Sequence, residues 1–165
     1  MPAPEETRTP VTSVLDRLLD DDPGVSREPA RNRHQILREL KQSVRRDLEN
    51  LLNTRQRCLP VPAHLAELKQ SLVNYGTPDF TAGSMGALKD RQDFARVLQA
   101  IITQYEPRFK SVKVALVDAA EPLDRTLRFR IDALLQAEPA PEPVVFDSIL
   151  KPGTGDFEVR GAGHG

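Results

Sequence analysis

Hydrophobic residues recur at helical spacing through most of the first two thirds of the chain. In residues 31–53 they fall at steps of three and four positions, which places them on one face of a helix. That stripe consists of Leu37, Leu40, Val44, Leu48 and Leu51. Residues 85–105 carry a wider apolar face, so we expect this second long helix to be the central helix of the core. Its apolar members are Leu88, Phe94, Val97, Leu98, Ile101, Ile102 and Tyr105. Shorter periodic stretches predict helices over residues 13–19 and 63–72.

After Arg108 the hydrophobic period changes from about four to two. This alternation predicts strands over residues 112–117, 127–136, 144–150 and 156–160. The strand at 127–136 is the clearest, because its apolar positions alternate with mostly charged ones, as in an antiparallel sheet with one face in water. Helices that precede strands favour an α+β fold over alternating βαβ units. We therefore predict a single α+β domain, with N-terminal helices packed on a small C-terminal antiparallel sheet.

The two ends of the chain differ in composition from the part between them. Residues 1–12 are rich in proline, glutamate and threonine, and residues 161–165 read Gly-Ala-Gly-His-Gly. Neither segment can bury enough apolar surface to offset its ordering entropy. We expect a disordered tail at 1–12, one folded domain at 13–160 and a flexible tail at 161–165. A chain of 165 residues suits one such domain with one core.

Positive and negative charges nearly balance, with 23 Lys and Arg against 24 Asp and Glu. This balance gives no overall case for nucleic acid or an anionic membrane as a partner. One region departs from it, because residues 31–57 hold eight basic residues and three acidic ones. A basic helix face that binds nucleic acid or an acidic protein therefore stays open as an alternative function. The single cysteine excludes an internal disulfide, and we expect a cytoplasmic protein because no secretory signal and no membrane-length apolar run is evident.

The residues that could carry catalysis or bind a metal are scattered. Cys58 lies beside prolines without a marked histidine partner, and His34, His64 and His164 have no metal-ligand spacing. Three consecutive aspartates at 20–22 lack the spaced acids and later glutamate of a calcium loop, which indicates a polar helix exit. No glycine-rich phosphate loop is present. The sequence thus predicts no cofactor and no metal.

Glu138, Asp147 and Thr154 follow one another in the order of a lysozyme-like carboxylate pair with a threonine. A retaining glycosidase holds its two carboxyls about 5 Å apart, and an inverting one about 6.5–9.5 Å. Nine residues of extended chain span roughly 30 Å, so this pair could meet only if the proline-rich connector at 138–143 folded back. A muramidase acting on cell-wall glycan stays as the alternative enzymatic reading.

The tripeptide Glu106-Pro107-Arg108 joins the second long helix to the first strand. Pro107 ends the helix because it lacks an amide hydrogen and its ring clashes with the preceding turn. Glu106 is also pushed out of helical geometry by the proline that follows it. Two opposite charges thus lie at a rigid corner, where either a solvated helix terminator or a binding site is consistent with the residues.

Five short stretches, taken together, resemble the TssE family of baseplate wedge subunits from bacterial type VI secretion systems. They also resemble the related wedge protein of contractile phage tails, a group often labelled lysozyme-like. The stretches that carry the resemblance are residues 13–18, 43–55, 72–80, 106–108 and 146–148. They follow one another in order through almost the whole chain, and only the terminal tails fall outside the resemblance. Thr77 departs from the pattern, since the family is associated with an apolar residue there, and we expect it to affect loop packing more than function.

The resemblance implies a structural role and no conserved glycosidase centre. Such a subunit contacts TssF, TssG and TssK in the wedge and offers a sheet on which the sheath proteins TssB and TssC begin to assemble. The family's Glu-Pro-Arg signature maps onto Glu106, Pro107 and Arg108, which the resemblance implies dock on the wedge core. It further implies a cytoplasmic protein recruited to the baseplate at the inner membrane, without membrane insertion or nucleic acid.

Two physical expectations follow for these elements. The strand at 156–160 is short and late, so we expect an edge strand that can accept a strand from another chain. We expect Glu106 and Arg108 to form charge-assisted hydrogen bonds to a partner. On that reasoning, alanine at either position leaves the fold intact and weakens binding to the wedge.

Overall fold

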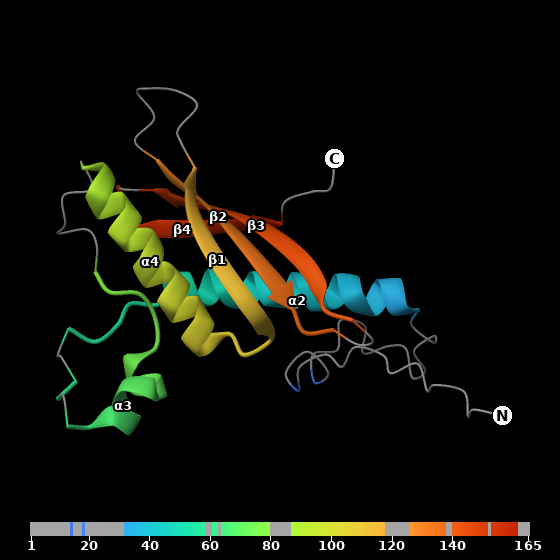
Figure 1. The fold of residues 1–165 in the computed structure, drawn as a ribbon, viewed down its shortest axis with the longest axis horizontal. Coiled ribbons are helices and arrows are strands. Elements are labelled where there is room, and N and C mark those ends of the chain that lie inside the picture. Colours follow the sequence, from blue (N-terminus) through green and yellow to red (C-terminus); the bar gives the residue numbers. More distant parts are fainter. Residues whose placement is uncertain are drawn as a thin grey trace.

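The computed structural model describes residues 14, 18, 32–58, 61–62, 64–79, 87–117, 126–137, 140–151 and 153–161. Helices precede a four-stranded antiparallel sheet, which confirms the predicted α+β fold (Figure 1). The elements are α2 (Arg33–Asn53), α3 (Ala66–Gln70), the 3-10 turn η1 (Leu72–Asn74), α4 (Leu88–Tyr105), β1 (Phe109–Val117), β2 (Leu127–Leu135), β3 (Glu142–Lys151) and β4 (Asp156–Gly161).

A capping box starts α2. The Asn32 side chain accepts a hydrogen bond from the Gln35 amide at 2.9 Å, and the Gln35 side chain accepts one from the Asn32 amide at 2.9 Å. Both donors would otherwise lack partners at the helix start. The predicted apolar stripe faces the core, with Leu37 at its half-buried margin. The buried residues of α2 are Leu40, Ser43, Val44, Leu48, Leu51 and Leu52.

The strands follow one another in the sheet in the order β1-β2-β3-β4, each antiparallel to its neighbour. One face of β2 is buried and the other is exposed and carries Arg128, Arg130 and Asp132, as the alternation predicted. β1 begins at Phe109, earlier than the predicted residue 112, because the Phe109 ring enters the core and lies 6.4 Å from that of Phe146. An irregular register between residues 109 and 111 accommodates this early start.

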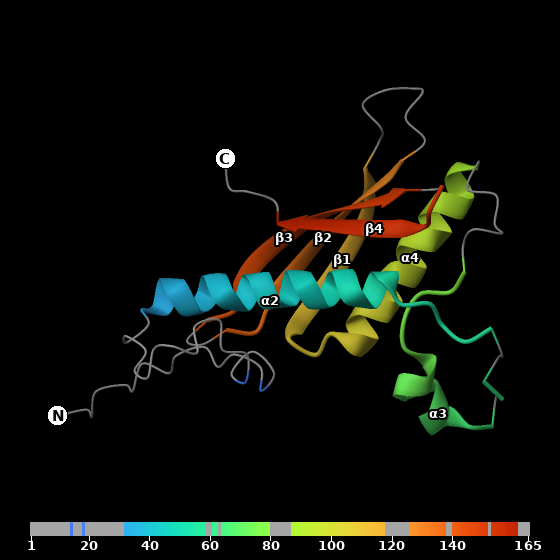
Figure 2. The ribbon, with the colours of Figure 1, turned by 180° about the vertical axis from the view of Figure 1, so that it is seen from behind.

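The two long helices flank the sheet at opposite edges. In Figures 1 and 2, α4 lies beside β1 and α2 runs beside β4. The ring of Phe94 from α4 reaches across the core, with its centroid 5.4 Å from that of Phe129 and 6.2 Å from that of Phe157. α4 does not bury its whole predicted face, because Leu88 and Val97 stay exposed. Since α2 buries a comparable apolar face, the two helices contribute similarly to the core and neither is its single central helix.

The segment after η1 closes the C-terminal end of α2. Gly76 has φ of +105°, and a Cβ there would lie 2.4 Å from the Thr54 carbonyl oxygen, so the close approach requires glycine. Thr77 is fully buried; its hydroxyl donates to the Leu52 carbonyl at 3.0 Å and its amide donates to the Thr54 carbonyl at 2.8 Å. These bonds satisfy carbonyls that a helix end leaves without partners. Thr77 therefore has a structural task, in line with the expected effect on loop packing.

Several sequence expectations fall outside the described residues. These are most of the helix at 13–19, the aspartates at 20–22, Glu138 and the segments 1–12 and 162–165. Gly161 belongs to β4, one residue past the predicted end of the domain. Within the described ranges, no helix is both long and apolar enough to cross a membrane.

Candidate functional site: the Glu106–Arg108 corner and the sheet edges

The corner at residues 106–108 is fixed by backbone hydrogen bonds on both sides. The Glu106 amide still donates to the Ile102 carbonyl at 2.9 Å, so Glu106 caps α4. Two residues later the chain enters the sheet, where the Gln136 amide donates to the Arg108 carbonyl at 2.8 Å. Pro107 at the apex is exposed. The corner thus connects helix and sheet within three residues, as the proline predicted.

The Arg108 guanidinium makes four side-chain hydrogen bonds inside the chain. Its Nε donates to Glu106 Oε1 at 2.7 Å and its Nη2 donates to Glu106 Oε2 at 2.5 Å, a bidentate pair. Nη2 also donates to Asp47 Oδ2 at 2.7 Å, and Nη1 donates to Ser43 Oγ at 3.1 Å. Ser43 and Asp47 lie one turn apart on α2. Arg108 therefore ties the exit of α4 to the middle of α2, and we call these four residues the corner clamp.

Burial and charge act in opposite directions on Arg108. Burial alone lowers the pKa of the guanidinium, but the hydrogen bonds and charges of Glu106, and then of Asp47, outweigh it and hold the pKa above its usual range. The Glu106 side chain is only 6% exposed, whereas those of Arg108 and Asp47 are 23% and 32% exposed. The buried carboxylate thus depends on Arg108 for its partner.

Tyr75 extends the clamp toward the loop that follows η1. Burial, followed by the charges of Asp47 and Glu106, raises the pKa of the Tyr75 phenol. The Tyr75 ring meets that of Tyr105 edge-on with centroids 5.2 Å apart, and the Tyr105 hydroxyl donates to the Ser71 carbonyl at 3.2 Å. Tyr75 therefore anchors the loop, and it joins α4, α2 and the loop at one point.

The clamp changes what the corner charges can do. The sequence predicted that Glu106 and Arg108 are available to a partner and that alanine at either leaves the fold intact. In the structure both charges are engaged within the chain, so their removal would leave polar groups unpaired at the junction of α2 with α4, whereas their docking on a partner stays a prediction. Only Pro107 and the exposed parts of Arg108 and Asp47 remain for an outside contact.

Side chains of α2 cover the outer edge of β4. The Phe157 amide donates to Asn53 Oδ1 at 2.8 Å, and the Phe157 carbonyl accepts from Asn53 Nδ2 at 2.9 Å. Two residues on, the Val159 carbonyl accepts from Arg45 Nη1 at 3.1 Å. β4 is an edge strand, as expected, but both outward groups of Phe157 and the outward carbonyl of Val159 already have partners. The expectation that this strand offers an open edge is therefore wrong at Phe157 and at the Val159 carbonyl.

The opposite edge is covered in the same way at its middle. The Val114 amide of β1 donates to Gln99 Oε1 of α4 at 3.0 Å. Each long helix thus places an amide side chain against the strand that it flanks. Side chains that hydrogen-bond to an edge strand in this way protect the sheet edge from pairing with other chains.

Those residues considered for catalysis that the structure describes do not converge. Asp147 lies on the exposed face of β3, 3.5 Å from Arg130, and Thr154 lies in the turn before β4, where its hydroxyl accepts from the Asp156 amide. Cys58, His34 and His64 are exposed on separate segments. Among the described residues no group of three or more His, Cys, Asp or Glu could hold a metal ion.

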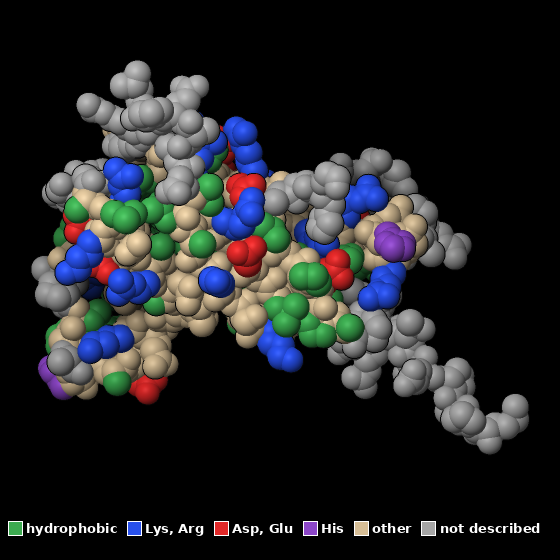
Figure 3. Space-filling view, turned by 45° about the horizontal axis from the view of Figure 1, so that its top comes forward, with side chains coloured by type: hydrophobic (Ala, Val, Ile, Leu, Met, Phe, Trp, Pro, Cys, Tyr) green, Lys and Arg blue, Asp and Glu red, His purple; other side chains and the backbone are tan. Residues whose placement is uncertain are grey.

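Part of the basic charge around α2 is paired within the chain, since Arg45 pairs with Glu49 at 2.7 Å and Lys41 pairs with Glu142 at 3.0 Å. Arg55 keeps its charge, although its Nη2 donates to the Gly155 carbonyl at 2.6 Å. On the face that Figure 3 displays, blue and red side chains intermingle.

Sequence reasoning missed four residues of these sites: Ser43, Asp47, Asn53 and Gln99. Ser43 and Asp47 carried a weak signal, because they lie four positions apart beside the apolar stripe of α2. Their partners lie 65 and 61 positions away, which spacing along the chain cannot reveal.

Comparison with known proteins gives one family. The sequence profile of the family described as baseplate wedge protein gp25 matches residues 38–140. No curated protein sequence matches the chain. One solved chain, from a structure titled "The baseplate complex from the type VI secretion system", is similar at a TM-score of 0.48 and 21% identity, over 69% of this chain and 96% of that chain.

Proposed function

This chain belongs to the family of baseplate wedge protein gp25, and we propose that it is the wedge subunit of a type VI secretion baseplate. As a family member it is a structural baseplate protein. The match over residues 38–140 carries the proposal, because it includes most of α2, the corner clamp, β1 and β2. The type VI assignment is further supported by the TssE-like stretches within and beyond that range.

We propose that the corner docks on the TssF, TssG and TssK assembly through Pro107 and the exposed side of the clamp. In this proposal the clamp first shapes the surface, and Glu106 acts through Arg108 instead of touching the partner itself. The sheath proteins TssB and TssC then begin to assemble on the sheet. The subunit works without catalysis, in the cytoplasm, on a baseplate docked at the inner membrane.

Co-purification with the TssF–TssG–TssK wedge of the same system tests this proposal. Arg108→Lys keeps the charge but loses the bidentate fork that Glu106 and Asp47 require. Asp47→Asn weakens the clamp while leaving Glu106, Pro107 and Arg108 in place. Arg130→Lys changes an exposed ion pair on the sheet face and is the matched control.

We expect wild type and Arg130→Lys to co-elute with the wedge, Asp47→Asn to bind it more weakly and Arg108→Lys to be lost, at a temperature where circular dichroism shows all four folded. Co-elution of all four refutes docking at the corner. Failure of the wild type to co-elute refutes the wedge role itself.

Two further assays address the sheath and the enzymatic alternative. TssB–TssC polymerisation should start on wedges that contain this chain and not on wedges that lack it. Release of soluble fragments from peptidoglycan should stay at background for wild type and for Glu138→Gln alike, since the corner and sheet suit assembly and not glycan hydrolysis. Turnover that Glu138→Gln abolishes would overturn the structural role.

A further inference from the structure

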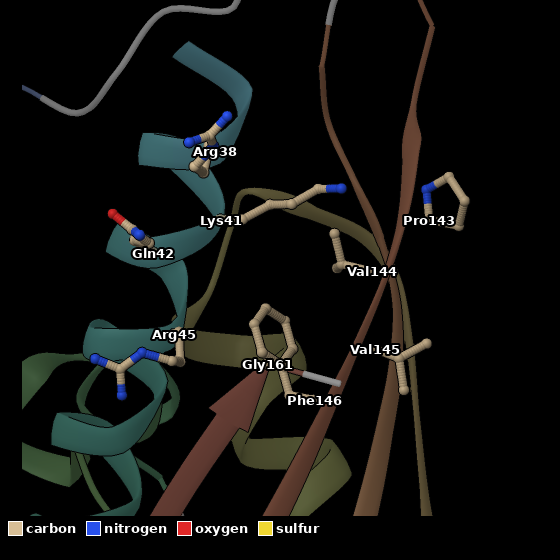
Figure 4. A pocket seen from close by; sticks show the side chains of 9 residues that line it. All are labelled: Arg38, Lys41, Gln42, Arg45, Pro143, Val144, Val145, Phe146 and Gly161. Atoms are coloured by element: carbon tan, nitrogen blue, oxygen red, sulfur yellow. The ribbon is translucent and has the colours of Figure 1, made fainter. Parts of the chain in front are cut away.

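A cavity of about 160 Å³ opens between the N-terminal half of α2 and the first half of β3. Figure 4 shows that the Val144 and Phe146 side chains of β3 point toward α2, near the tip of β4 where Gly161 ends that strand. The helix side of the cavity is polar and consists of Arg38, Lys41, Gln42 and Arg45. A cavity of roughly 150 Å³ holds a molecule as large as benzene, so this one has room for an apolar side chain.

The cations of this cavity are only partly paired. Lys41 pairs with Glu142 at 3.0 Å, and Arg45 pairs with Glu49 at 2.7 Å. Arg38 is exposed and, within the described part of the chain, has neither an ion pair nor a hydrogen bond. The cavity thus combines an apolar floor with an unpaired positive charge at its rim. An occupant that is both apolar and acidic would satisfy both.

Residues 13–22 of the same chain have this composition. They carry four aspartates against one arginine, and three of the aspartates follow one another at 20–22. Their apolar residues are Val14, Leu15, Leu18 and Leu19. Val14 and Leu18 are helical in the structure and lie four positions apart on one helix face, yet they are 72% and 75% exposed. The described members of this apolar face therefore have no cover.

The chain between this segment and α2 is long enough to bring the two together. Asn32 follows Asp22 by ten positions, and ten extended residues span at most about 35 Å. Arg38 lies six positions beyond Asn32, only about 9 Å along the helix axis. Pro23-Gly24 directly after the aspartates favours a turn, so the segment can run back along α2. Two parts of one chain also meet at a high effective concentration, which favours even a modest contact.

Two other segments of the chain fit the cavity less well. Residues 162–165 follow Gly161 directly, but they read Ala-Gly-His-Gly and offer neither an acidic nor a large apolar side chain. Residues 118–125 include three acids, but they join β1 to β2 at the ends of these strands opposite to the cavity. Residues 13–22 therefore match the cavity better than either.

We propose that residues 13–22 dock on this cavity as a short helix that runs antiparallel to α2. The leucines of the segment cover Val144 and Phe146, and its three consecutive aspartates lie beside Arg38. Burial of the leucines drives docking, and the charges fix its direction. The contact lies within one chain, so it holds whether or not the chain is a wedge subunit.

A spin label tests the contact in the full chain. Cys58→Ser removes the sole cysteine, and Ser13→Cys carries the label. NMR then measures the paramagnetic relaxation enhancement at each ¹⁵N-labelled amide. We expect a strong enhancement at Gln42 and Gly161, which line the cavity, and none at α3, which lies beyond the C-terminal end of α2 (Figure 2).

Charge reversal separates docking from proximity along the chain. Arg38→Glu should lower the ratio of docked to free segment roughly fivefold, as expected of an exposed ion pair, and lysine at positions 20–22 should lower it at least as much. Combining both changes restores the ion pairs with opposite sign and should recover most of the wild-type enhancement. Arg96→Glu is the matched control and should change nothing, because Arg96 is exposed on α4 and pairs with Asp93.

A second pair of variants tests the apolar half of the contact. Leu18→Ser should release the segment and lower the enhancement at Gly161, because it removes an apolar side chain from the docked face. Leu72→Ser changes a leucine of η1 that is similarly exposed, at 80% against 75%, and should leave the enhancement unchanged.

Three results would overturn the proposal. Absence of an enhancement at Gln42 and Gly161 means that the segment does not reach the cavity. An enhancement that Arg38→Glu and Leu18→Ser both leave unchanged reflects the connection along the chain alone. An equally strong enhancement between separately labelled chains assigns the segment to a second copy and not to its own chain. Wedge co-purification is independent of these results, so failure of either experiment leaves the conclusion of the other standing.

Discussion

Arg108→Ala should destabilise the fold substantially, because Arg108 is the partner of a buried carboxylate. The substitution removes two hydrogen bonds to Glu106, at 2.7 and 2.5 Å, one to Asp47 at 2.7 Å and one to Ser43 at 3.1 Å. Glu106 then keeps only the backbone amide of residue 108, at 3.2 Å, while its side chain is 6% exposed. Breaking a buried ion pair from one side costs roughly 3–5 kcal/mol.

The loss in the free energy of unfolding for Arg108→Ala should fall at the lower end of that range. The Arg108 side chain is 23% exposed, so water screens part of its interaction and we expect a loss of about 3 kcal/mol in the free energy of unfolding. For a chain of this size that corresponds to a fall of about 6–12 °C in the melting temperature. Urea unfolding followed by circular dichroism measures the loss in the free energy of unfolding. It also checks that the slope of this free energy against urea concentration is unchanged.

Two companion variants make the reasoning refutable. Arg130→Ala removes a surface ion pair of 3.5 Å and should cost less than about 1 kcal/mol. Adding Glu106→Gln to Arg108→Ala removes the stranded charge and should restore roughly 1–2 kcal/mol. If Arg108→Ala costs no more than Arg130→Ala, or if Glu106→Gln restores nothing, the clamp is not what holds α2 to the corner.

Three further predictions concern the loop at Gly76, the dependence of stability on alkaline pH, and the buried core. Gly76→Ala should cost more than about 2 kcal/mol, because its Cβ would lie 2.4 Å from the Thr54 carbonyl oxygen at φ of +105°, whereas Gly153→Ala meets nothing within 4 Å and should be nearly neutral in the same urea titration. Folding raises the pKa of the Tyr75 phenol above 10.0, so the stability that Tyr75 contributes is complete below pH 10 and is lost as the pH rises through the pKa of the folded protein. Tyr75→Phe should therefore flatten the decline in the free energy of unfolding above pH 10. An equal decline in the wild type and the variant would contradict this. Ser148 is buried with an unpartnered hydroxyl, so Ser148→Ala should be neutral or stabilising by up to about 1 kcal/mol, and a clear loss would reveal a partner for that hydroxyl.

The sequence predicted the elements that a local pattern defines. The three- and four-residue spacing of leucines located α2, and the alternation after Arg108 located all four strands to within three residues at their starts. It overestimated the apolar face of α4, since Leu88 and Val97 are 59% and 37% exposed. Composition cannot tell how far around a helix its partners reach.

The candidate site was predicted by position but not by chemistry. The proline marked the corner, yet the task of its charges depends on Asp47, which lies on another element 61 positions away. The same holds for the edge of β4, which looked open because its cover, Asn53, lies 104 positions earlier. Long-range partners decide whether a polar group is free, and no spacing rule supplies them.

The packing of α2 on β4 has a consequence for how the chain acquires its structure. Asn53 and Phe157 are bonded across 104 positions, so the earliest long helix completes its contacts on the latest strand. Loops of this length make native pairing slow to form and leave apolar faces uncovered in the meantime. During synthesis the leucines of α2 leave the ribosome well before their cover, at about 5–20 residues per second. Folding of this protein is therefore a late, concerted event, and the interval before β4 emerges is when a chaperone would be needed most.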